Sequence, residues 1–116
     1  MPHVIFELSD NVIEKGLNDI LVEIHQILTD TLPTRIESCK SRILRHQSFL
    51  IGNGNIDDAF VHLNIEVLPG RSKATLDLTA SKIIIALQDY FKNSIEQLNL
   101  NLSVSIKDLP ATYHKL

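Results

Sequence analysis

Met1-Pro2-His3-Val4-Ile5-Phe6-Glu7 opens the chain and decides how the remainder is arranged. From Val4 onward, Phe6 and Leu8 alternate with Ile5 and Glu7, the period of a β-strand with one buried face. The pattern predicts a strand that begins almost at once and fixes Pro2 at its start.

Pro2 has two interpretations. A methionine before a small proline is a substrate for methionine removal, which would leave the Pro2 nitrogen as a free secondary amine. Burial beside cations lowers the pKa of an amine, so a proline amine held at a strand end can act as a base. If Met1 is retained, Pro2 is an amide that cannot act as a base, and it simply begins an edge strand.

Composition restricts the class of protein. The 116 residues form one domain that buries roughly two-thirds of its unfolded surface, a modest core that oligomerisation would help. The net charge is −3 and the Lys and Arg residues are scattered, so nucleic-acid binding is not expected.

Cysteine and histidine usage gives no sign of a disulfide framework or a metal. Cys39 is the only cysteine, which suits a reducing, cytoplasmic setting. The five histidines lack the spacing of metal ligands, and neither a signal peptide nor a membrane span is expected. No metal or cofactor is predicted.

The first half of the chain continues with a helix and a second strand. Asn11 and Glu14 have the spacing of a capping box, so a helix is expected from about Asn11, ending before Pro33. Its apolar residues follow the 3.6-residue period. An extended segment over about 39–51 and a Gly52-Asn53-Gly54-Asn55 turn follow, predicting a hairpin or a slightly longer loop.

The second half repeats this order. Residues 61–67 alternate as a strand, Ser72 is a candidate N-cap for a helix running to about Gln97, and residues 98–106 alternate again. The tail from Lys107 looks irregular.

The repeated order predicts an α+β fold: two right-handed βαβ units, residues 1–56 and 57–116, forming a four-stranded mixed sheet with two helices on one face. The other face is left uncovered. Phe49, Leu50 and Ile51 indicate more apolar surface than two helices bury, which favours a closed ring of subunits.

Five blocks of sequence resemble the 5-carboxymethyl-2-hydroxymuconate isomerase family of the tautomerase superfamily. They occur in the family's order and spacing over nearly the whole chain: Met1-Pro2-His3, Glu7 with Ser9-Asp10-Asn11, Lys40-Ser41-Arg42, Asp58-Ala59-Phe60-Val61-His62 and Gly70-Arg71-Ser72. The resemblance implies a tautomerase-like homotrimer, with an amino-terminal proline as general base in a proton shift on an unsaturated keto acid of aromatic-compound degradation.

The resemblance makes Pro2 the candidate catalytic base and Arg71, Arg42 and Lys40 the candidate substrate-binding residues. Arg71 precedes the first turn of a helix, where an anion is favoured. Arg42 and Lys40 are two apart on an extended segment and so share a face. Lys40 stands where an arginine is expected, and its point charge lacks the planar fork of arginine, which leaves the substrate open.

Two alternatives remain at this point. One is a non-enzymatic oligomeric binding protein with the same fold and a blocked amine, which retention of Met1 would favour. The other is a different proline-dependent reaction, such as decarboxylation or hydration.

Overall fold

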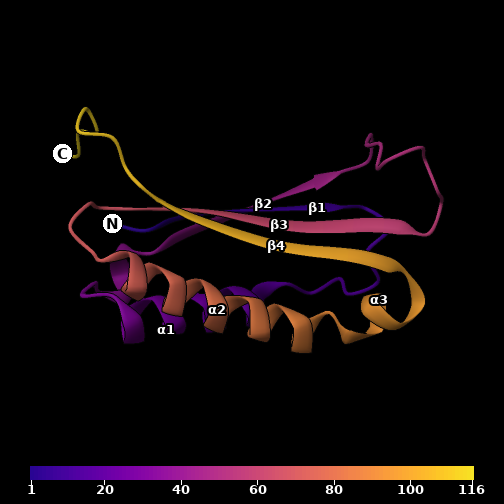
Figure 1. The fold of residues 1–116 in the computed structure, drawn as a ribbon, viewed down its shortest axis with the longest axis horizontal. Coiled ribbons are helices and arrows are strands. Elements are labelled where there is room, and N and C mark those ends of the chain that lie inside the picture. The colour runs from indigo at the N-terminus through magenta and orange to yellow at the C-terminus, as the bar shows by residue number, and fades with distance from the viewer.

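The computed structural model describes residues 1–116 as a four-stranded sheet with its helices on one face (Figure 1). The strands are β1 (His3–Ser9), β2 (Lys40–His46), β3 (Asp58–Val67) and β4 (Asn99–Asp108), in the order β2-β1-β3-β4. β1 is parallel to β2 and antiparallel to β3, and β3 is parallel to β4. The predicted mixed sheet of two βαβ units is confirmed.

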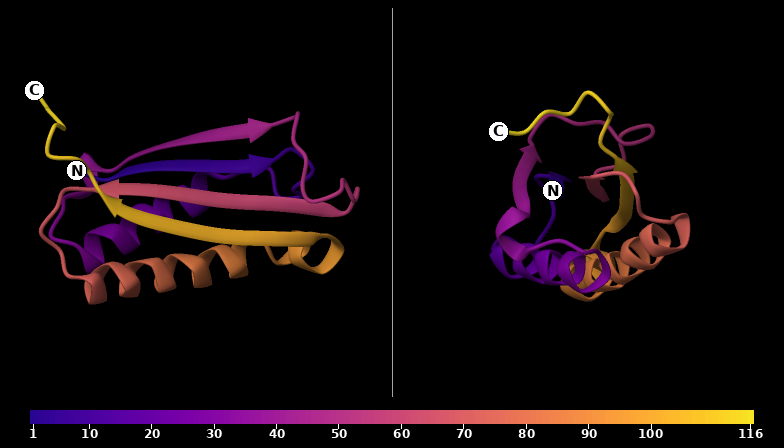
Figure 2. Two further views of the ribbon diagram at one scale, coloured as in Figure 1. Left: turned by 45° about the horizontal axis from the view of Figure 1, so that its top comes forward. Right: turned by 90° about the vertical axis from the view of Figure 1, so that its left-hand side faces the viewer.

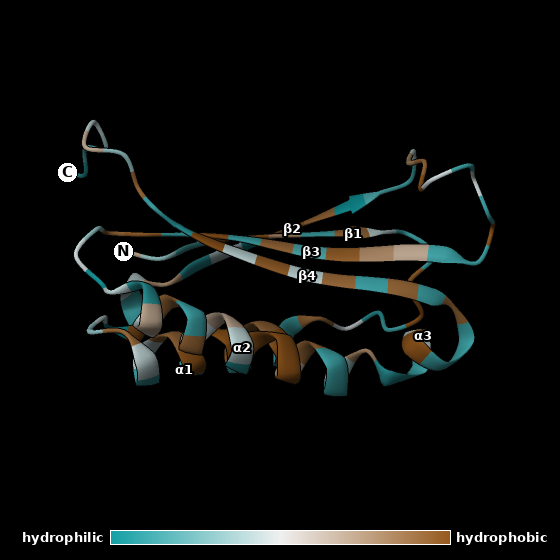
Figure 3. Ribbon diagram, in the orientation of Figure 1, coloured by the Kyte–Doolittle hydropathy of each residue, from teal (hydrophilic) through white to brown (hydrophobic).

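The core lies between the sheet and helices α1 (Asn18–Thr31) and α2 (Lys73–Tyr90). Alternate residues of the central strands face the helices, while hydrophilic residues interleave with apolar ones along β4 (Figure 3). Each fully buried aliphatic or aromatic side chain contributes about 1.5–3 kcal/mol to stability. The largest of them include Phe6, Leu8, Ile20, Ile24, Leu63, Ile65, Ile83 and Leu87.

The prediction that the first helix begins near Asn11 is wrong, since α1 begins at Asn18. Neither predicted capping residue caps α1. The Asn11 side-chain amide donates to the carbonyl of Asp58 at 2.8 Å. The Glu14 carboxylate instead accepts from the backbone N–H groups of Asn93 (3.1 Å) and Ser94 (3.3 Å) at the start of the short helix α3 (Lys92–Gln97).

The second predicted helix is interrupted. Ser72 does cap α2, accepting from the Thr75 N–H at 3.2 Å, but α2 ends at Tyr90 and α3 continues to Gln97. Phe91 at the break is fully buried, and its ring centroid lies 6.1 Å from that of Phe6. The change of direction therefore places an aromatic ring in the core.

Of the two predicted alternatives for Gly52-Asn53-Gly54-Asn55, a hairpin or a longer loop, the structure shows the longer loop. β1 lies between β2 and β3, so these two strands cannot pair. β2 ends at His46, before the predicted end at Ile51. Gly54 has a φ of +92°, which favours glycine in this turn.

Much of the uncovered apolar surface lies in this loop, although Leu44 of β2 is also 47% exposed. Leu50 is 77% exposed and Ile56 is 88% exposed. On the open sheet face, His62 Nδ1 lies 2.7 Å from the Ser103 hydroxyl oxygen. None of the helices combines the length and apolar character needed to cross a membrane.

Replacing Glu14 by alanine should lower the free energy of unfolding by about 1–2 kcal/mol, because α3 loses its cap and the Ser94 hydroxyl loses its 2.5 Å partner. Denaturant unfolding at one fixed protein concentration measures this. Lys15→Ala, an exposed neighbour, is the matched control. Equal stabilities for the two variants would contradict this account of Glu14.

Candidate active site

The N-terminus lies at the end of the sheet where β3 and β4 finish (Figure 2). Pro2 is buried, and its carbonyl accepts from the backbone N–H of Lys40 at 3.0 Å, just before β1 pairs with β2. The loop after β3, which carries Arg71, reaches the same end, as does the tail after β4. Three distant parts of the chain therefore meet around the first two residues.

A cavity of about 390 Å³ opens at this meeting point. It gathers three cationic side chains, Arg35, Arg71 and Lys115, and no acidic residue. Such a site suits an anionic ligand. Its lining residues are Met1, Pro33, Thr34, Arg35, Ser38, Leu68, Arg71, Tyr113 and Lys115.

The terminal amine in this structure is that of Met1, and its pKa is lowered from the ordinary value. Burial is the largest cause, and the positive charge of Arg71 is the next. Lys115 and Lys40 lower the pKa further, while Cys39 opposes them. Because both burial and nearby cations disfavour an ammonium ion, the amine loses its proton at a lower pH than an exposed terminus.

Arg71 lies in the cavity wall, between β3 and α2. Gly70 before it has a φ of +117°, a conformation that favours glycine and turns the chain toward the N-terminus. The Arg71 Nη1 group donates to the carbonyl of Leu68 at 2.5 Å, and its buried Nε has no partner. The guanidinium is therefore held in place with a donor still unused.

Lys40 and Arg42 occupy different positions relative to the cavity, and neither lines it. Lys40 Nζ donates to the Met1 sulfur at 3.0 Å, so it is next to the terminal residue. Arg42 Nη1 lies 3.1 Å from Nδ1 of His3. The structure thus brings Arg71 beside the amine, Lys40 against the Met1 side chain, and Arg42 to the neighbouring residue.

The sequence did not single out three cationic or aromatic residues of the cavity: Arg35, Tyr113 and Lys115. Arg35 follows the Pro33 that ends α1, a position that carried no motif. Tyr113 and Lys115 belong to the tail, which has no periodic pattern. The one signal present was an aromatic and a basic side chain close together in a short terminal segment.

Two βαβ units sharing one sheet, with a buried proline at the start of the first strand and an arginine beside the terminal amine, define a tautomerase-like protein. The family model of 5-carboxymethyl-2-hydroxymuconate isomerase matches residues 2–115. The chain belongs to this family of isomerases.

Comparison with individual relatives supports this assignment to the family. The chain is 26% identical over 113 residues to the 5-carboxymethyl-2-hydroxymuconate Delta-isomerase of Escherichia coli, covering 97% of this chain and 90% of that protein. A crystal structure of a 5-carboxymethyl-2-hydroxymuconate isomerase from Deinococcus radiodurans R1 superposes with a TM-score of 0.89 at 26% identity, over 98% of this chain and 88% of that one. A fused 4-OT symmetric trimer shares the fold, with a TM-score of 0.69 at 14% identity over 98% and 90% of the two chains.

Replacing Arg71 by alanine should raise the pKa of the terminal amine, because a cation that destabilises the ammonium form is removed. The amine of the variant would then hold its proton to a higher pH. An NMR titration of the α-amine measures the midpoint, with Lys92→Ala, an exposed cation on α3, as the control. Identical midpoints in the Arg71 variant and the unmodified protein would refute the assignment of Arg71 as a cause.

Proposed function

We propose that this isomerase shifts a proton on an unsaturated, carboxylated 2-hydroxydienoate such as 5-carboxymethyl-2-hydroxymuconate, with Pro2 as the general base. The observation that carries the proposal is the buried terminal amine at a cavity lined by Arg35, Arg71 and Lys115. Removal of Met1 would free the Pro2 nitrogen and add the volume of the Met1 side chain to the cavity. The named activity of the Escherichia coli relative supports the substrate class.

The reaction needs only one group that accepts and returns a proton. The free Pro2 amine takes the proton of the 2-hydroxyl group, which leaves a dienolate and a secondary ammonium ion. The ammonium ion then delivers this proton to a carbon of the conjugated system, giving the 2-oxo product and restoring the amine. No atom is lost and no electron is transferred to another molecule, so the shift requires no cofactor. Lowering the pKa of the amine raises the fraction that is present as the free base at a given pH.

The surrounding cations have two functions in this scheme. They attract the substrate carboxylates, and they stabilise the negative charge that develops on the dienolate oxygen. Arg71 is the first candidate because it lines the cavity and retains an unpaired Nε donor. The same positive charge disfavours the protonated amine, so binding and activation of the base have a common source.

Lys40 and Arg42 extend this positive region. Loss of Met1 removes the sulfur that Lys40 Nζ contacts, which frees its ammonium group for a substrate carboxylate. Arg42 adds positive charge beside His3. Because lysine offers a point charge where arginine offers a planar fork, Lys40 is expected to affect which carboxylated substrate is preferred.

We also propose that the active unit is a homotrimer. The outer edges of β2 and β4 have no neighbouring strand within the chain, and exposed hydrophobic side chains gather in the loop 47–57. The 4-OT relative forms a symmetric trimer with the same fold. A closed ring would pair or cover these edges and the loop.

Pro2→Ala should retain the fold and lower kcat/KM for ketonisation of 2-hydroxymuconate by about 10²-fold or more, because the constrained secondary amine is replaced by a mobile primary one. A stopped-flow ultraviolet assay measures the rate, and circular dichroism checks the fold. Lys92→Ala serves as the control for surface substitution. An unchanged rate in the proline variant would contradict the proposed mechanism.

Leu50→Asp should shift the protein from trimer toward monomer, because a charge would be buried between subunits. Sedimentation velocity over a range of concentrations measures the assembly. Leu78→Asp, an equally apolar change at a 51% exposed position on α2, is the matched control. A monomeric parent protein, or the same trimer in both variants, would argue against this interface.

A further inference from the structure

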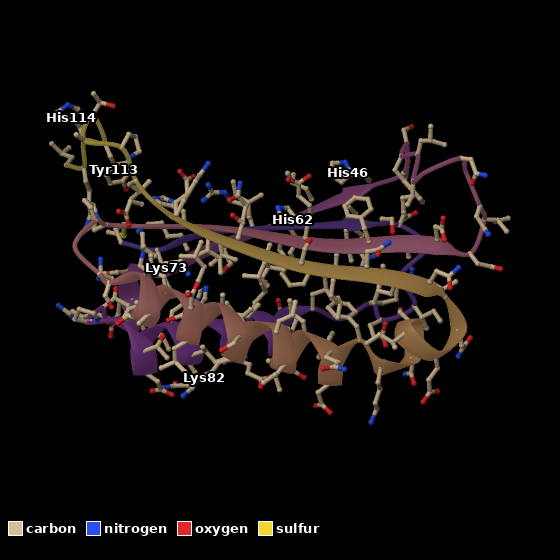
Figure 4. The ribbon with its side chains drawn as sticks, in the orientation of Figure 1. His46, His62, Lys73, Lys82, Tyr113 and His114 are labelled. Carbon is tan, nitrogen blue, oxygen red and sulfur yellow. The ribbon has the colours of Figure 1, made fainter.

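Two residues of the C-terminal tail, Tyr113 and Lys115, line the cavity, although most of residues 110–116 are exposed. Leu109 is buried, and its N–H donates to the carbonyl of Val67 at 2.7 Å. The N–H of Tyr113 closes a turn onto the carbonyl of Pro110 at 2.9 Å. These contacts return the chain to the end of the sheet where the N-terminus lies, and Figure 4 shows Tyr113 at this end. Tyr113 is one of the residues that line the cavity.

A chain of two hydrogen bonds joins Tyr113 to β2. Arg42 Nη1 lies 3.1 Å from His3 Nδ1, and His3 Nε2 lies 2.9 Å from the Tyr113 hydroxyl oxygen. The His3 and Tyr113 rings also meet edge to face, with centroids 5.8 Å apart and planes at 73°. The tyrosine ring is therefore held in both position and orientation.

The chemistry of arginine fixes the direction of both bonds. A guanidinium has only donors, so His3 Nδ1 must accept from Arg42. A histidine that accepts at Nδ1 carries its proton on Nε2, and this proton is donated to the Tyr113 oxygen. The Tyr113 O–H group is then left without an acceptor in the chain, although the residue lines a cavity that gathers cations.

We propose that Tyr113 is a substrate-binding residue whose hydroxyl donates a hydrogen bond to an anionic oxygen of the bound substrate, and that His3 and Arg42 are positioning residues acting through it. The proposal rests on the proposed function and adds a neutral donor to the cations of the cavity. Arg71 and Lys115 line the same cavity and attract the anion that this hydroxyl then orients.

The protonation state of His3 agrees with this direction of donation. Burial is the main cause that lowers the pKa of His3, and the charges of Arg42 and Lys40 lower it further, against an opposing effect of Glu66. The terminal amine also lowers it. Near neutral pH the ring is therefore neutral, as an acceptor for Arg42 must be.

Tyr113→Phe tests the proposal by removing one oxygen atom while keeping the ring. We expect kcat/KM for 2-hydroxymuconate to fall about 10-fold or more, the usual effect of losing a hydrogen bond to a charged group. Tyr90→Phe, the same chemical change at a residue that bonds to Gly16 away from the cavity, should change kcat/KM by less than about 2-fold.

The role of His3 is tested by a double-mutant cycle. If His3 acts through Tyr113, His3→Phe should reduce the rate in the parent protein but add no further loss to Tyr113→Phe. Independent, multiplying losses would overturn the positioning role.

Calorimetric binding of muconate, which lacks the 2-hydroxyl group, shows whether Tyr113 recognises a carboxylate oxygen or the dienolate oxygen. The same measurement also distinguishes this proposal from the proposed function. Weaker muconate binding by Tyr113→Phe, with a higher KM, indicates a carboxylate; unchanged muconate binding with a lower kcat indicates the dienolate oxygen. If the parent protein binds muconate through Tyr113 but does not turn over 2-hydroxymuconate, the proposed function fails and this inference stands. Unchanged kinetics and unchanged muconate affinity in Tyr113→Phe, or a parent protein that neither binds muconate nor reacts, overturn it.

Discussion

The pairing of β1 on both edges is the constraint on which the site depends. His3 aligns with Lys40 of β2 on one side and with Glu66 of β3 on the other. The extra bond from the Lys40 N–H to the Pro2 carbonyl extends this ladder by one residue. A chain terminus is ordinarily among the most mobile parts of a domain. Here the sheet holds it still, so a terminal amine can be placed as accurately as a side chain of the core.

In the proposed mechanism, the positive charges at this end of the sheet serve both to bind the substrate and to activate the amine. Positive charges from the loop after α1, the loop before α2 and the tail converge on one cavity, and only Arg35 has a carboxylate partner, Glu37 at 3.4 Å. Such an arrangement costs stability unless a ligand or a neutral amine shares the space. Lowering the pKa of the amine is one response to this positive potential, and attraction of a carboxylated substrate is the other. Met1 lines this cavity, so the proposed mechanism requires its removal before Pro2 can act as the base.

Much of the architecture could be predicted from local sequence because the determining signals are local. The alternation in β1, β3 and β4 and the Ser72 cap depend only on neighbouring residues, and each was predicted from the sequence. The errors have a common origin in contacts between distant residues. Glu14 has the spacing of a cap for its own helix, yet it caps α3 about eighty positions later. The hairpin at Gly54 was excluded by β1, which takes the position between the two strands.

The residues of the candidate site also divide into those with a local sequence signal and those without one. Pro2 and Arg71 could be proposed from the sequence because each belongs to a block of residues with a recognisable order. Tyr113 and Lys115 were missed because nothing in an aperiodic tail reveals where it folds; the burial of Leu109 decides that, and it depends on the assembled sheet. Arg42 was expected to share a face with Lys40, and the sequence did not predict its contact with His3 of the neighbouring strand.

The central claim is that the mature chain begins with a free proline amine, and the intact mass of the untagged protein tests it most directly. The account predicts a mass lower than that of the full sequence by one methionine residue, throughout the sample. A mass that retains Met1 would make Pro2 an amide, contradict its role as base and favour a protein that binds carboxylated ligands without turning them over.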